Sequence, residues 1–508
     1  MLIGEILSNT ANKFPDKPAV ICGKDICSFA DLEELSNRVA NGIIRSGLGR
    51  GSVLGILSTN QFEYPGIFFG CAKSGCVLAH MSTRFTDDEL CNVITSSDVK
   101  ALFVHEKFLE TILRLAGKLT GLEKIIVFGN KKTYPPNVMH LEEFLIGAQS
   151  TPVSIKLNTD DAFGITYTGG TTGFPKGVVV SHRSRIIGSI RAQREMDISE
   201  NDIICCSSPL FHIAGLFIWF QTGVLMGLTA VLMPAWDPEA FVDLVEKQKI
   251  TAAFLVPTQI NSIITSTMLD SDKLKSLRYV NYGAAPTSRA QLEKQLEVLP
   301  SVIWQEQYGQ SEAGNLTVRP TEFNLSKSAS VGKPYSDLEL QIFGSDNNKV
   351  ANGEVGEVVT RGDHVMLGYY REPDKTKEVF IGEGWLKTGD MGYLDEDGFL
   401  FLVDRSKDMI ISGGENIFPT EIEEVLYNHP SINECAVFGV PDDHWGELPA
   451  AHIVLEKSKQ LTVEEIDKYC IENMARHKRP RLIKFVEKLP KSAVGKIQKN
   501  IIRDEYWP

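Results

Sequence analysis

The sequence predicts an α/β protein with a large N-terminal domain of doubly wound α/β subdomains plus a small β-barrel, and a smaller α+β C-terminal domain. A chain of 508 residues exceeds what one hydrophobic core usually supports. Up to about residue 330, short apolar runs alternate with amphipathic helical patterns, which is typical of parallel strands joined by crossover helices. The pattern changes after Val331 and again near Arg405, which indicates two further kinds of structure.

The elements of the chain are expected in a regular order. A helix is predicted over residues 29–47, and buried strands are predicted at KPAVI (17–21), VLGIL (53–57), ALFV (101–104), KIIVF (124–128) and AAFLV (252–256). Alternating residues with turn signals over 338–362 favour a small antiparallel barrel or sheet. A βα-rich segment follows, so we expect a boundary at Asp404 to Lys407, with domains of residues 1–404 and 405–508.

Charge and cysteine content exclude some classes of function. A net charge of −13 and a pI near 5.4 argue against binding of nucleic acid or anionic lipid by the chain as a whole. Nine cysteines, an odd number, argue against a disulfide framework and for a reducing compartment. The first residues lack a basic segment followed by an apolar run, so no secretory signal is expected and the cytoplasm is the predicted location.

Two patterns in the sequence resemble a membrane span and a zinc site, and we expect neither. Residues 213–233 contain no charge and are long enough to span a membrane, but Gln221, Gly223 and Gly227 interrupt them. A buried helix ending near Gly227 and a short core strand are predicted instead. The cysteine pairs at 22 and 27 and at 71 and 76 have a spacing that zinc could use, yet core packing is the expected role of these thiols.

The segment YTGGTTGFPKG, residues 167–177, combines glycines, threonines and a lysine as a phosphate-binding loop does. It is not a Walker A loop, because Pro175 precedes Lys176 and Gly177 follows it. Apolar strands are expected before and after the loop, whereas a helix follows a Walker A loop. A surface hairpin without a ligand is the alternative interpretation.

Five further blocks reduce the weight of that alternative. They are YGAAP (282–286), QYGQSEAG (307–314), GWLKTGD (384–390), DRSKDMIISGGENIFPTEIE (404–423) and PKSAVGKIQK (490–499). With this set the chain resembles, over nearly its whole length, the adenylate-forming superfamily and above all its AMP-forming acyl-CoA synthetase branch. Gly169 departs from the family pattern, which often has serine there, so one hydroxyl donor is missing while a backbone N–H remains.

The resemblance implies a reaction and its substrates. A carboxylate and ATP would form an acyl-adenylate and pyrophosphate, and the acyl group would pass to coenzyme A, with Mg²⁺ at the phosphates. It also implies a grip on the β- and γ-phosphates by Thr168, Gly169, Gly170, Thr171, Thr172 and Lys176. Ser311 and Glu312 fall at the position of α-phosphate and Mg²⁺ contact, where a carboxylate suits a hard cation.

For the adenosine part, the resemblance implies that Tyr308 stacks on adenine. Gly283, Ala284 and Ala285 let the base lie against the backbone, and Gln307 and Gly309 belong to the same nucleotide-binding block. Asp390 and Arg405 are implied to bind the ribose hydroxyls. The alternatives are a core tyrosine, a plain turn at Asp390 and a surface cation at Arg405.

The C-terminal domain is implied to be mobile, with its hinge at Lys407. Lys496 matches the family's catalytic lysine, which bridges the carboxylate and the α-phosphate, although a solvated lysine is the alternative. Ser412, Gly413 and Gly414 are implied to line the passage for the pantetheine arm of coenzyme A. The basic run ARHKRPRLIK (475–484) has no aromatic platform, so a solvated strand entrance is favoured over nucleic-acid binding, with contact to CoA phosphates second.

The segment PLFHIAGLFIWF, residues 209–220, resembles the family's acyl-site lining, with His212 near the carboxylate or the thiol passage. A core histidine is the alternative. No acidic residue lies in 211–220 to pair an ammonium group, so a fatty, alicyclic or aryl monocarboxylate is expected. A carrier-protein ligase, a luciferase-like oxidase and a non-catalytic nucleotide-binding relative remain as alternatives. We expect a monomer or homodimer, and the sequence leaves the direction of the reaction open.

Overall fold

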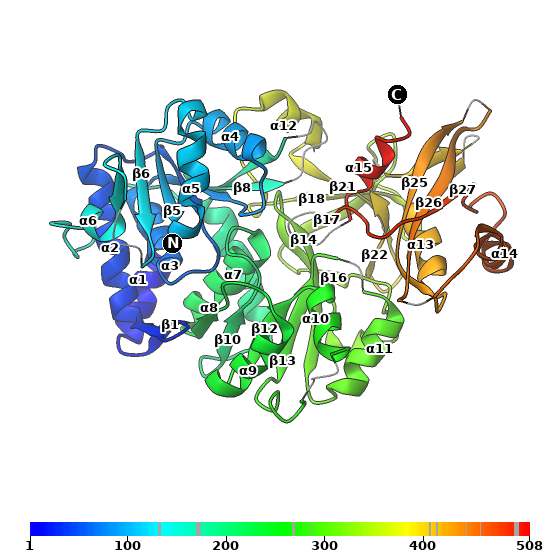
Figure 1. Ribbon diagram of the computed structural model, residues 1–508, viewed down its shortest axis with the longest axis horizontal. Helices are drawn as coiled ribbons and strands as arrows, with labels where there is room; N and C mark the ends of the chain where they lie inside the picture. Colours follow the sequence, from blue (N-terminus) through cyan, green and yellow to red (C-terminus); the bar gives the residue numbers. More distant parts are fainter. Residues whose placement is uncertain are drawn as a thin grey trace. The chain divides into compact units, whose positions relative to one another are not determined.

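The computed structural model describes residues 1–130, 134–168, 174–266, 270–285, 287–405, 408–412, 415–442, 444–457, 459–491 and 497–507, with the backbone alone at residues 405, 415 and 416. The chain divides into two compact units. Unit 1 contains Met1–Glu339 and Thr360–Leu386, and unit 2 contains Leu340–Val359 and Lys387–Pro508 (Figure 1). This division groups most of the small sheet with the C-terminal part. The hinge expected at Lys407 concerns motion and stays a prediction.

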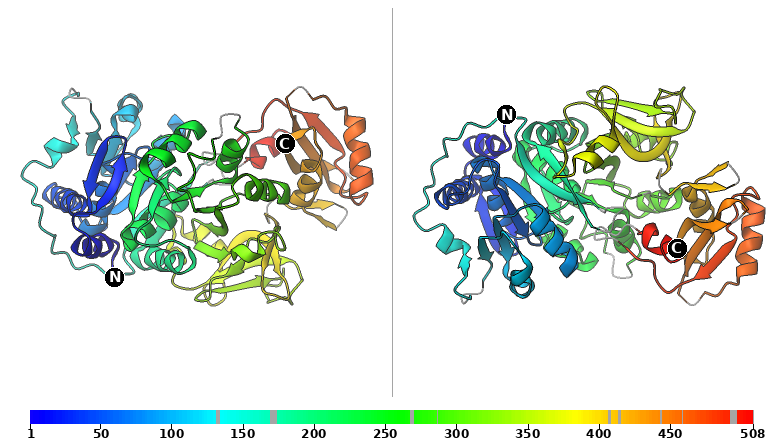
Figure 2. Two further views of the ribbon diagram at one scale, coloured as in Figure 1. Left: turned by 90° about the horizontal axis from the view of Figure 1, so that it is seen from below. Right: turned by 90° about the horizontal axis from the view of Figure 1, so that it is seen from above.

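The first sheet of unit 1 has eight strands, and helices flank it in Figures 1 and 2. All neighbouring strands from β7 to β8 are parallel, whereas β9 and β19 run antiparallel at the other edge. In sheet order the strands are β19 (Gly368–Tyr369), β9 (Lys176–Ser181), β8 (Ala162–Thr168), β4 (Val77–Met81), β3 (Val53–Leu57), β5 (Ala101–His105), β6 (Lys124–Phe128) and β7 (Val138–His140). The predicted strands at 53–57, 101–104 and 124–128 are therefore confirmed.

The helices around this sheet begin at clear sequence signals. Ser28 caps helix α2 by accepting from the Asp31 N–H, and the Asp31 side chain accepts from the Ser28 N–H in return. Apolar side chains of α4 and α5 pack on β3, β4 and β5 in one core. The helices are α1 (Ile3–Lys13), α2 (Phe29–Arg45), α3 (Tyr64–Ser74), α4 (Asp87–Ser96), α5 (Glu106–Leu115) and α6 (Leu141–Phe144), with a 3₁₀ turn η1 (Ala116–Lys118).

The second sheet of unit 1 has nine strands, and its central strands are parallel. Its order is β16 (Lys333–Pro334), β15 (Gly314–Val318), β14 (Ile303–Gln310), β13 (Tyr279–Gly283), β12 (Ala252–Leu255), β10 (Ile203–Cys206), β11 (Thr229–Leu232), β1 (Pro18–Cys22) and β2 (Asp25–Ser28). Helices α9 (Pro238–Gln248), α10 (Pro257–Ile264) and α11 (Arg289–Val298) bury apolar side chains against β12 and β13. Two such sheets confirm the doubly wound prediction.

The uncharged segment 213–233 folds as its interruptions predict. It forms a π-helix η2 (Ala214–Phe220) and then α8 (Gln221–Met226), which ends at Gly227 with φ 74° before the buried strand β11. A Cβ at Gly227 would lie 2.6 Å from the Phe14 ring. Within the described ranges, no helix has the length and apolar character of a membrane span.

The cysteines named in the sequence are packed in the core. Cys22, Cys27, Cys71 and Cys76 are buried and unbridged. Burial raises the pKa of Cys22 and Cys76 to about 11, so these thiols stay protonated. The predicted core role is confirmed, and the part of the chain that the structure describes holds no group of three metal-ligating side chains.

The remaining elements of unit 1 lead to the small sheet. They are α7 (His182–Glu195), η3 (Thr321–Phe323) and α12 (Pro373–Val379). The small sheet has five strands, which are β17 (Glu339–Phe343), β18 (Gly356–Arg361), β21 (Trp385–Leu394), β20 (Phe380–Ile381) and β22 (Leu400–Arg405). The alternating pattern over 338–362 thus forms strands, as predicted.

The rest of unit 2 is a five-stranded sheet with a core on each face. Its strands are β24 (Glu415–Ile417), β23 (Ile410–Ser412), β26 (Gly446–Leu455), β25 (Ile432–Asp442) and β27 (Leu482–Phe485), and its helices are α13 (Pro419–Tyr427), α14 (Val463–Asn473) and α15 (Lys499–Arg503). Along β25, Cys435 and Val437 belong to one core and Ala436 and Phe438 to the other. The basic run 475–484 leads into β27, as expected for a strand entrance.

Candidate active site

The glycine-rich loop connects two paired strands. Thr168, the last residue of β8, pairs with Lys176, the first residue of β9, and the two strands are antiparallel. The strand after the loop confirms that this is not a Walker A loop. A Cβ at Gly177 would lie 2.9 Å from Ile165 Cγ2, so glycine lets the strands approach. Gly169, Gly170, Thr171 and Thr172 lie outside the described residues.

Lys176 and Glu312 meet at one tyrosine. The Tyr369 hydroxyl donates to Glu312 Oε1 at 3.0 Å, and Lys176 Nζ lies 5.2 Å from the Tyr369 ring centroid. Burial and the charge of Glu312 raise the pKa of Tyr369 well above its usual value, so the phenol remains a donor. The Glu312 carbonyl accepts from Met366 N–H at 2.7 Å, which fixes the backbone of the carboxylate. Sequence reasoning did not find Tyr369.

The carboxylate of Glu312 can bind Mg²⁺ only if a bound substrate supplies further oxygen ligands. No cluster of three acidic, histidine or cysteine side chains surrounds it in the described ranges. A magnesium site of this kind uses one or two carboxylates and completes its octahedron with phosphate oxygens and water. The residues present therefore fit a metal that arrives with ATP.

Strands β13 and β14 form a narrow cradle next to Tyr308. Gly283 pairs with Gln307, and a Cβ at Gly283 would lie 2.1 Å from the Gln307 carbonyl oxygen. Ala284 follows with φ 69°, a left-handed conformation that is costly for alanine, and Ala285 is half-buried. A Cβ at Gly309 would lie 2.1 Å from the Gly314 carbonyl oxygen. Glycine at 283 and 309 therefore lets the adjacent backbone segments approach each other closely.

The Gln307 side chain indicates that a ligand binds near β13 and β14. It is 6% exposed, and its amide nitrogen and oxygen both lack a hydrogen-bond partner among the described residues. Buried polar atoms are rarely left without partners. The half-buried Tyr308 follows it at a β-bulge. An amide with one donor and one acceptor group fits the edge of a purine base.

The loop before the π-helix is fixed from helix α3 and the turn that precedes it. Asn60 Nδ2 donates to the carbonyls of Cys206 and Ser208, each at 2.9 Å, and its Oδ1 accepts from Leu210 N–H at 2.8 Å. The Tyr64 hydroxyl donates to the Leu210 carbonyl at 3.1 Å. These contacts hold the segment that carries His212, and sequence reasoning missed both residues.

His212 and the apolar lining lie on one segment. His212 is half-buried, and its Nδ1 accepts from the Ala214 N–H at 3.4 Å, which favours the proton on Nε2 in the neutral ring. Ala214 and Ile218 are buried on η2. A Cβ at Gly215 would lie 2.5 Å from the Pro209 carbonyl oxygen, so the loop and the helix pack without a side chain between them.

Unit 2 contains the other residues named in the sequence. Asp390, which is 4% exposed, stands opposite Arg405 in the β21–β22 pair, and its N–H donates to Thr388 Oγ1 at 3.1 Å. Ser412 is half-buried in β23. Lys407, Gly413, Gly414 and Lys496 lie outside the described residues, so their roles stay predictions.

The segment around Lys496 is tied down on both sides. Lys491 pairs with Ile497 in a β-bridge, and Gln498 N–H donates to the Pro490 carbonyl at 2.9 Å. Lys499 Nζ lies 2.8 Å from Glu423 Oε1, and this pair is largely buried, with side-chain exposures of 16% and 13%. Lys491 also pairs with Glu434. Both ends of the segment are therefore attached to α13 and β25.

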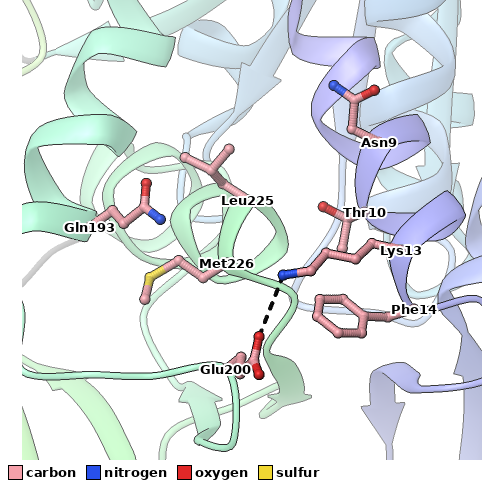
Figure 3. A pocket seen from close by; sticks show the side chains of 8 residues that line it. All are labelled: Asn9, Thr10, Lys13, Phe14, Gln193, Glu200, Leu225 and Met226. Atoms are coloured by element: carbon pink, nitrogen blue, oxygen red, sulfur yellow. Dashed lines mark hydrogen bonds and ion pairs between the residues drawn. The ribbon is translucent and has the colours of Figure 1, made fainter.

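A separate groove of about 310 Å³ lies between α1, the end of α7 and α8 (Figure 3). Lys13 Nζ lies 3.5 Å from Glu200 Oε2 across it, and both side chains are more than half exposed. None of the residues predicted from the sequence lines it. The groove is a solvated surface feature apart from the candidate site.

Comparison with known proteins adds to this geometry. Residues 7–370 match the family model of AMP-binding enzymes, and residues 421–496 match that of the AMP-binding enzyme C-terminal domain. The chain is 33% identical to the fatty acid–acyl-carrier-protein ligase ScoC of Streptomyces coeruleorubidus, over 97% of this chain and 94% of that protein.

It is also 32% identical to the 4-coumarate-CoA ligase 1 of Narcissus pseudonarcissus, over 97% of this chain and 91% of that protein. Among solved structures, the anthranilate CoA ligase AuaEII in complex with anthranoyl-AMP superposes with a TM-score of 0.92 at 26% identity. That match covers 100% of this chain and 97% of the other.

Proposed function

Because the chain belongs to the AMP-binding, adenylate-forming enzyme family and to its acid–CoA ligase branch, we propose that it is an AMP-forming acyl-CoA synthetase. It converts a carboxylate, ATP and CoA to acyl-CoA, AMP and pyrophosphate through an acyl-adenylate, in a reaction that can run both ways. A carboxylate is a poor acyl donor, since its leaving group would be oxide. Adenylation turns that oxygen into part of AMP, which leaves readily.

The observation that carries the proposal is the meeting of Lys176, Tyr369 and Glu312. A lysine at the end of the glycine loop suits the β- and γ-phosphates, together with Thr168, Gly169, Gly170, Thr171 and Thr172. Mg²⁺, held by Glu312, would neutralise charge on the phosphates. Tyr369 keeps the Glu312 carboxylate oriented, and Ser311 lies beside it at the α-phosphate.

In this proposal the adenosine part lies on the β13–β14 cradle. Gly283, Ala284, Ala285 and Gly309 bring no bulky side chain there, Tyr308 stacks on the base, and Gln307, whose amide lacks a partner among the described residues, bonds to its edge. Asp390 and Arg405 bind the ribose hydroxyls. Lys496 then bridges the carboxylate and the α-phosphate. Positioning of the reacting groups by the site as a whole lowers the activation free energy by ~7–11 kcal/mol.

The second half-reaction moves the acyl group to sulfur. The thiolate of CoA attacks the carbonyl of the adenylate, the bond to the phosphate oxygen breaks, and AMP leaves. We propose that domains 1–404 and 405–508 rotate about Lys407 between the two steps. Ser412, Gly413 and Gly414 then line the pantetheine passage, with His212 near the thiol or the carboxylate.

The acid is proposed to be an apolar monocarboxylate of the fatty, alicyclic or aryl class. The buried apolar face of η2, with Ala214 and Ile218, supports this class. An apolar pocket distinguishes neighbouring chain lengths by only ~1–3 kcal/mol per methylene, so several acids should be accepted. We further propose a cytoplasmic monomer or homodimer.

The test is acid-dependent exchange between ATP and labelled pyrophosphate over a panel of carboxylates, followed by addition of CoA. Exchange with some acids, and acyl-CoA once CoA is present, is the expected result. Exchange with no acid of the panel would support the alternative of a non-catalytic nucleotide-binding relative.

A second candidate is a ligase that delivers the acyl group to a carrier protein. The 33% identity to ScoC favours it. In that case exchange proceeds, but CoA yields no thioester, and a phosphopantetheinylated carrier protein accepts the acyl group instead. A side-by-side assay with both acceptors separates the two candidates.

A further inference from the structure

One buried arginine has no carboxylate partner in the part of the chain that the structure describes. Arg185, on α7, is 2% exposed, and its Nη2 donates to the Ser311 carbonyl at 2.6 Å. Its Nε is buried without an acceptor among the described residues. Within the same ranges, no carboxylate oxygen comes within 4.0 Å of the guanidinium in an ion pair. The negative charge of Glu312 attracts the guanidinium from beyond ion-pair distance.

The other two fully buried arginines differ from Arg185. Arg191, on the same helix, holds Asp337 with Nε 2.9 Å from Oδ1. Arg319 lies 2.6 Å from Glu306. A buried charge without a counter-ion is strongly unfavourable, whereas a paired one is tolerated. The unpaired charge of Arg185 therefore costs folding free energy. We expect this charge to serve a function that a permanent carboxylate partner would cancel.

Arg185 lies between the two segments on which substrates would meet. Its guanidinium carbon is 5.5 Å from the centroid of the Phe217 ring, on the π-helix that carries the apolar lining. A Cβ at Gly314 would lie 3.1 Å from its Nη1, two residues after Glu312. The Arg185 carbonyl accepts from Gln221 Nε2 at 3.1 Å, which ties its backbone to α8 as well.

The guanidinium keeps its charge at neutral pH. Burial lowers the pKa of Arg185 to about 9, and the attraction of Glu312 opposes that effect. In a dry interior, a fixed charge acts on its neighbours far more strongly than it does in water. ATP and a carboxylate both bring negative charge to the segment that Arg185 holds.

We propose that Arg185 is a positioning residue that holds the Ser311–Glu312 segment against the acyl-lining π-helix and supplies the positive field that compensates the two anionic substrates. It touches neither substrate. Its charge is balanced when they bind, which accounts for the missing partner in the protein itself. This inference rests on the proposed function, since it assigns the site's anions to ATP and the acid.

The experiment compares Arg185→Met, Arg185→Lys and the matched control Arg191→Met. Calorimetric binding of Mg²⁺ with α,β-methylene-ATP needs no turnover, so it is measured first. Loss of a charge-assisted hydrogen bond and its field should weaken nucleotide binding by ~10–100-fold in Arg185→Met. Arg191→Met should bind nucleotide within about two-fold of the wild type, because a paired arginine exerts little net field.

Stability should move in the opposite sense. Arg185→Met removes an unpaired buried charge, so its unfolding temperature should equal or exceed that of the wild type. Arg191→Met removes the buried one of the two arginines that pair with Asp337, the other being the half-exposed Arg194, and should unfold at a lower temperature. Weakened binding in a variant that is no less stable cannot come from general damage to the fold.

Arg185→Lys gives a signature in pH. Burial lowers the pKa of a lysine, so this variant should bind nucleotide well near neutrality and lose affinity at alkaline pH toward the level of Arg185→Met. Equal nucleotide affinity in all variants, or pH-independent loss in both Arg185 variants, would overturn the inference. A wild type that binds nucleotide but exchanges pyrophosphate with no acid would refute the proposed function and leave this binding test decisive.

Discussion

The site residues of unit 1 and the segment of unit 2 that carries Lys496 are held in different ways. In unit 1, Thr168, Lys176 and Gly283 stand at the ends of strands and Gln307 lies within β14, and register fixes their places. In unit 2, the segment of Lys496 is attached through side chains, chiefly the Lys499–Glu423 pair. Sheet register resists single substitutions, whereas one ion pair does not. The two units should therefore respond differently to pH and to mutation.

The largest difference is expected under acid. Burial lowers the pKa of His80 and His364 to about 3 and that of His182 to about 4, and all three lie in unit 1. The unfolded chain, with histidine pKa near 6.5, then binds more protons than the folded unit between pH 6.5 and 4. Stability from these residues is complete above pH 6.5 and falls by ~1.4 kcal/mol per pH unit and histidine as pH drops.

Hydrogen exchange at pH 7 and near pH 5 checks this expectation. Protection of backbone amides should fall more in unit 1 than in unit 2. In unit 2, burial lowers the pKa of His452. His182→Gln should reduce the slope for unit 1. An equal fall in both units would contradict the prediction.

The next effect concerns the ion pair of unit 2. Lys499→Met leaves the Glu423 carboxylate buried without its partner, which should cost ~3–5 kcal/mol of folding free energy in that unit. Protection in unit 2 should fall while unit 1 stays unchanged. Lys484→Met is the control, because Lys484 and Glu505 are more than half exposed and 3.8 Å apart. Such a surface pair contributes ~0–1 kcal/mol.

Lys496→Ala tests whether the two half-reactions are separable. Removal of a charged group from the developing charge should slow pyrophosphate exchange by ~10²–10³-fold. Thioester formation from supplied acyl-adenylate should be spared. Lys491→Ala, at the other end of the segment, is the control for damage to the fold. Loss of both half-reactions to the same extent would contradict the assignment of Lys496 to the first step.

The smallest effect is expected at Tyr369. Tyr369→Phe deletes the hydroxyl that donates to Glu312, and a lost hydrogen bond to a charged group corresponds to ~10-fold or more. The Mg²⁺ concentration for half-maximal exchange should rise, since Glu312 loses its orientation. Tyr370→Phe provides the neighbouring control. An unchanged Mg²⁺ requirement would show that Glu312 does not depend on Tyr369.

Local patterns predicted much of the fold and less of the site. The amphipathic pattern from Phe29, the apolar run at 53–57 and the stop at Gly227 are local signals, and each element formed where it was expected. Register then places Gly283 beside Gln307, as the family blocks imply. Such features depend on neighbours in sequence or on recognisable blocks.

The residues that sequence reasoning missed act over long separations. Tyr369 reaches Glu312 across 57 residues, Arg185 reaches Ser311 across 126 and Asn60 reaches Leu210 across 150. A tyrosine in a two-residue strand or an arginine inside a helix gives no local sign of its partner. The π-helical geometry of 214–220 also lacks a periodic signal that distinguishes it from an α-helix.

The π-helix has a consequence for how the family could vary or be engineered. Its hydrogen bonds span one residue more than those of an α-helix. The seven residues from Ala214 to Phe220 therefore contain more residues per turn than an α-helix needs. A one-residue deletion there could be absorbed by rewinding to an α-helix, which would rearrange the side chains from Ala214 to Phe220 while the residues before them keep their places. Gly227 and β11 would stay in place. The range of accepted substrates could thus change with the length of this segment, even where its composition stays the same.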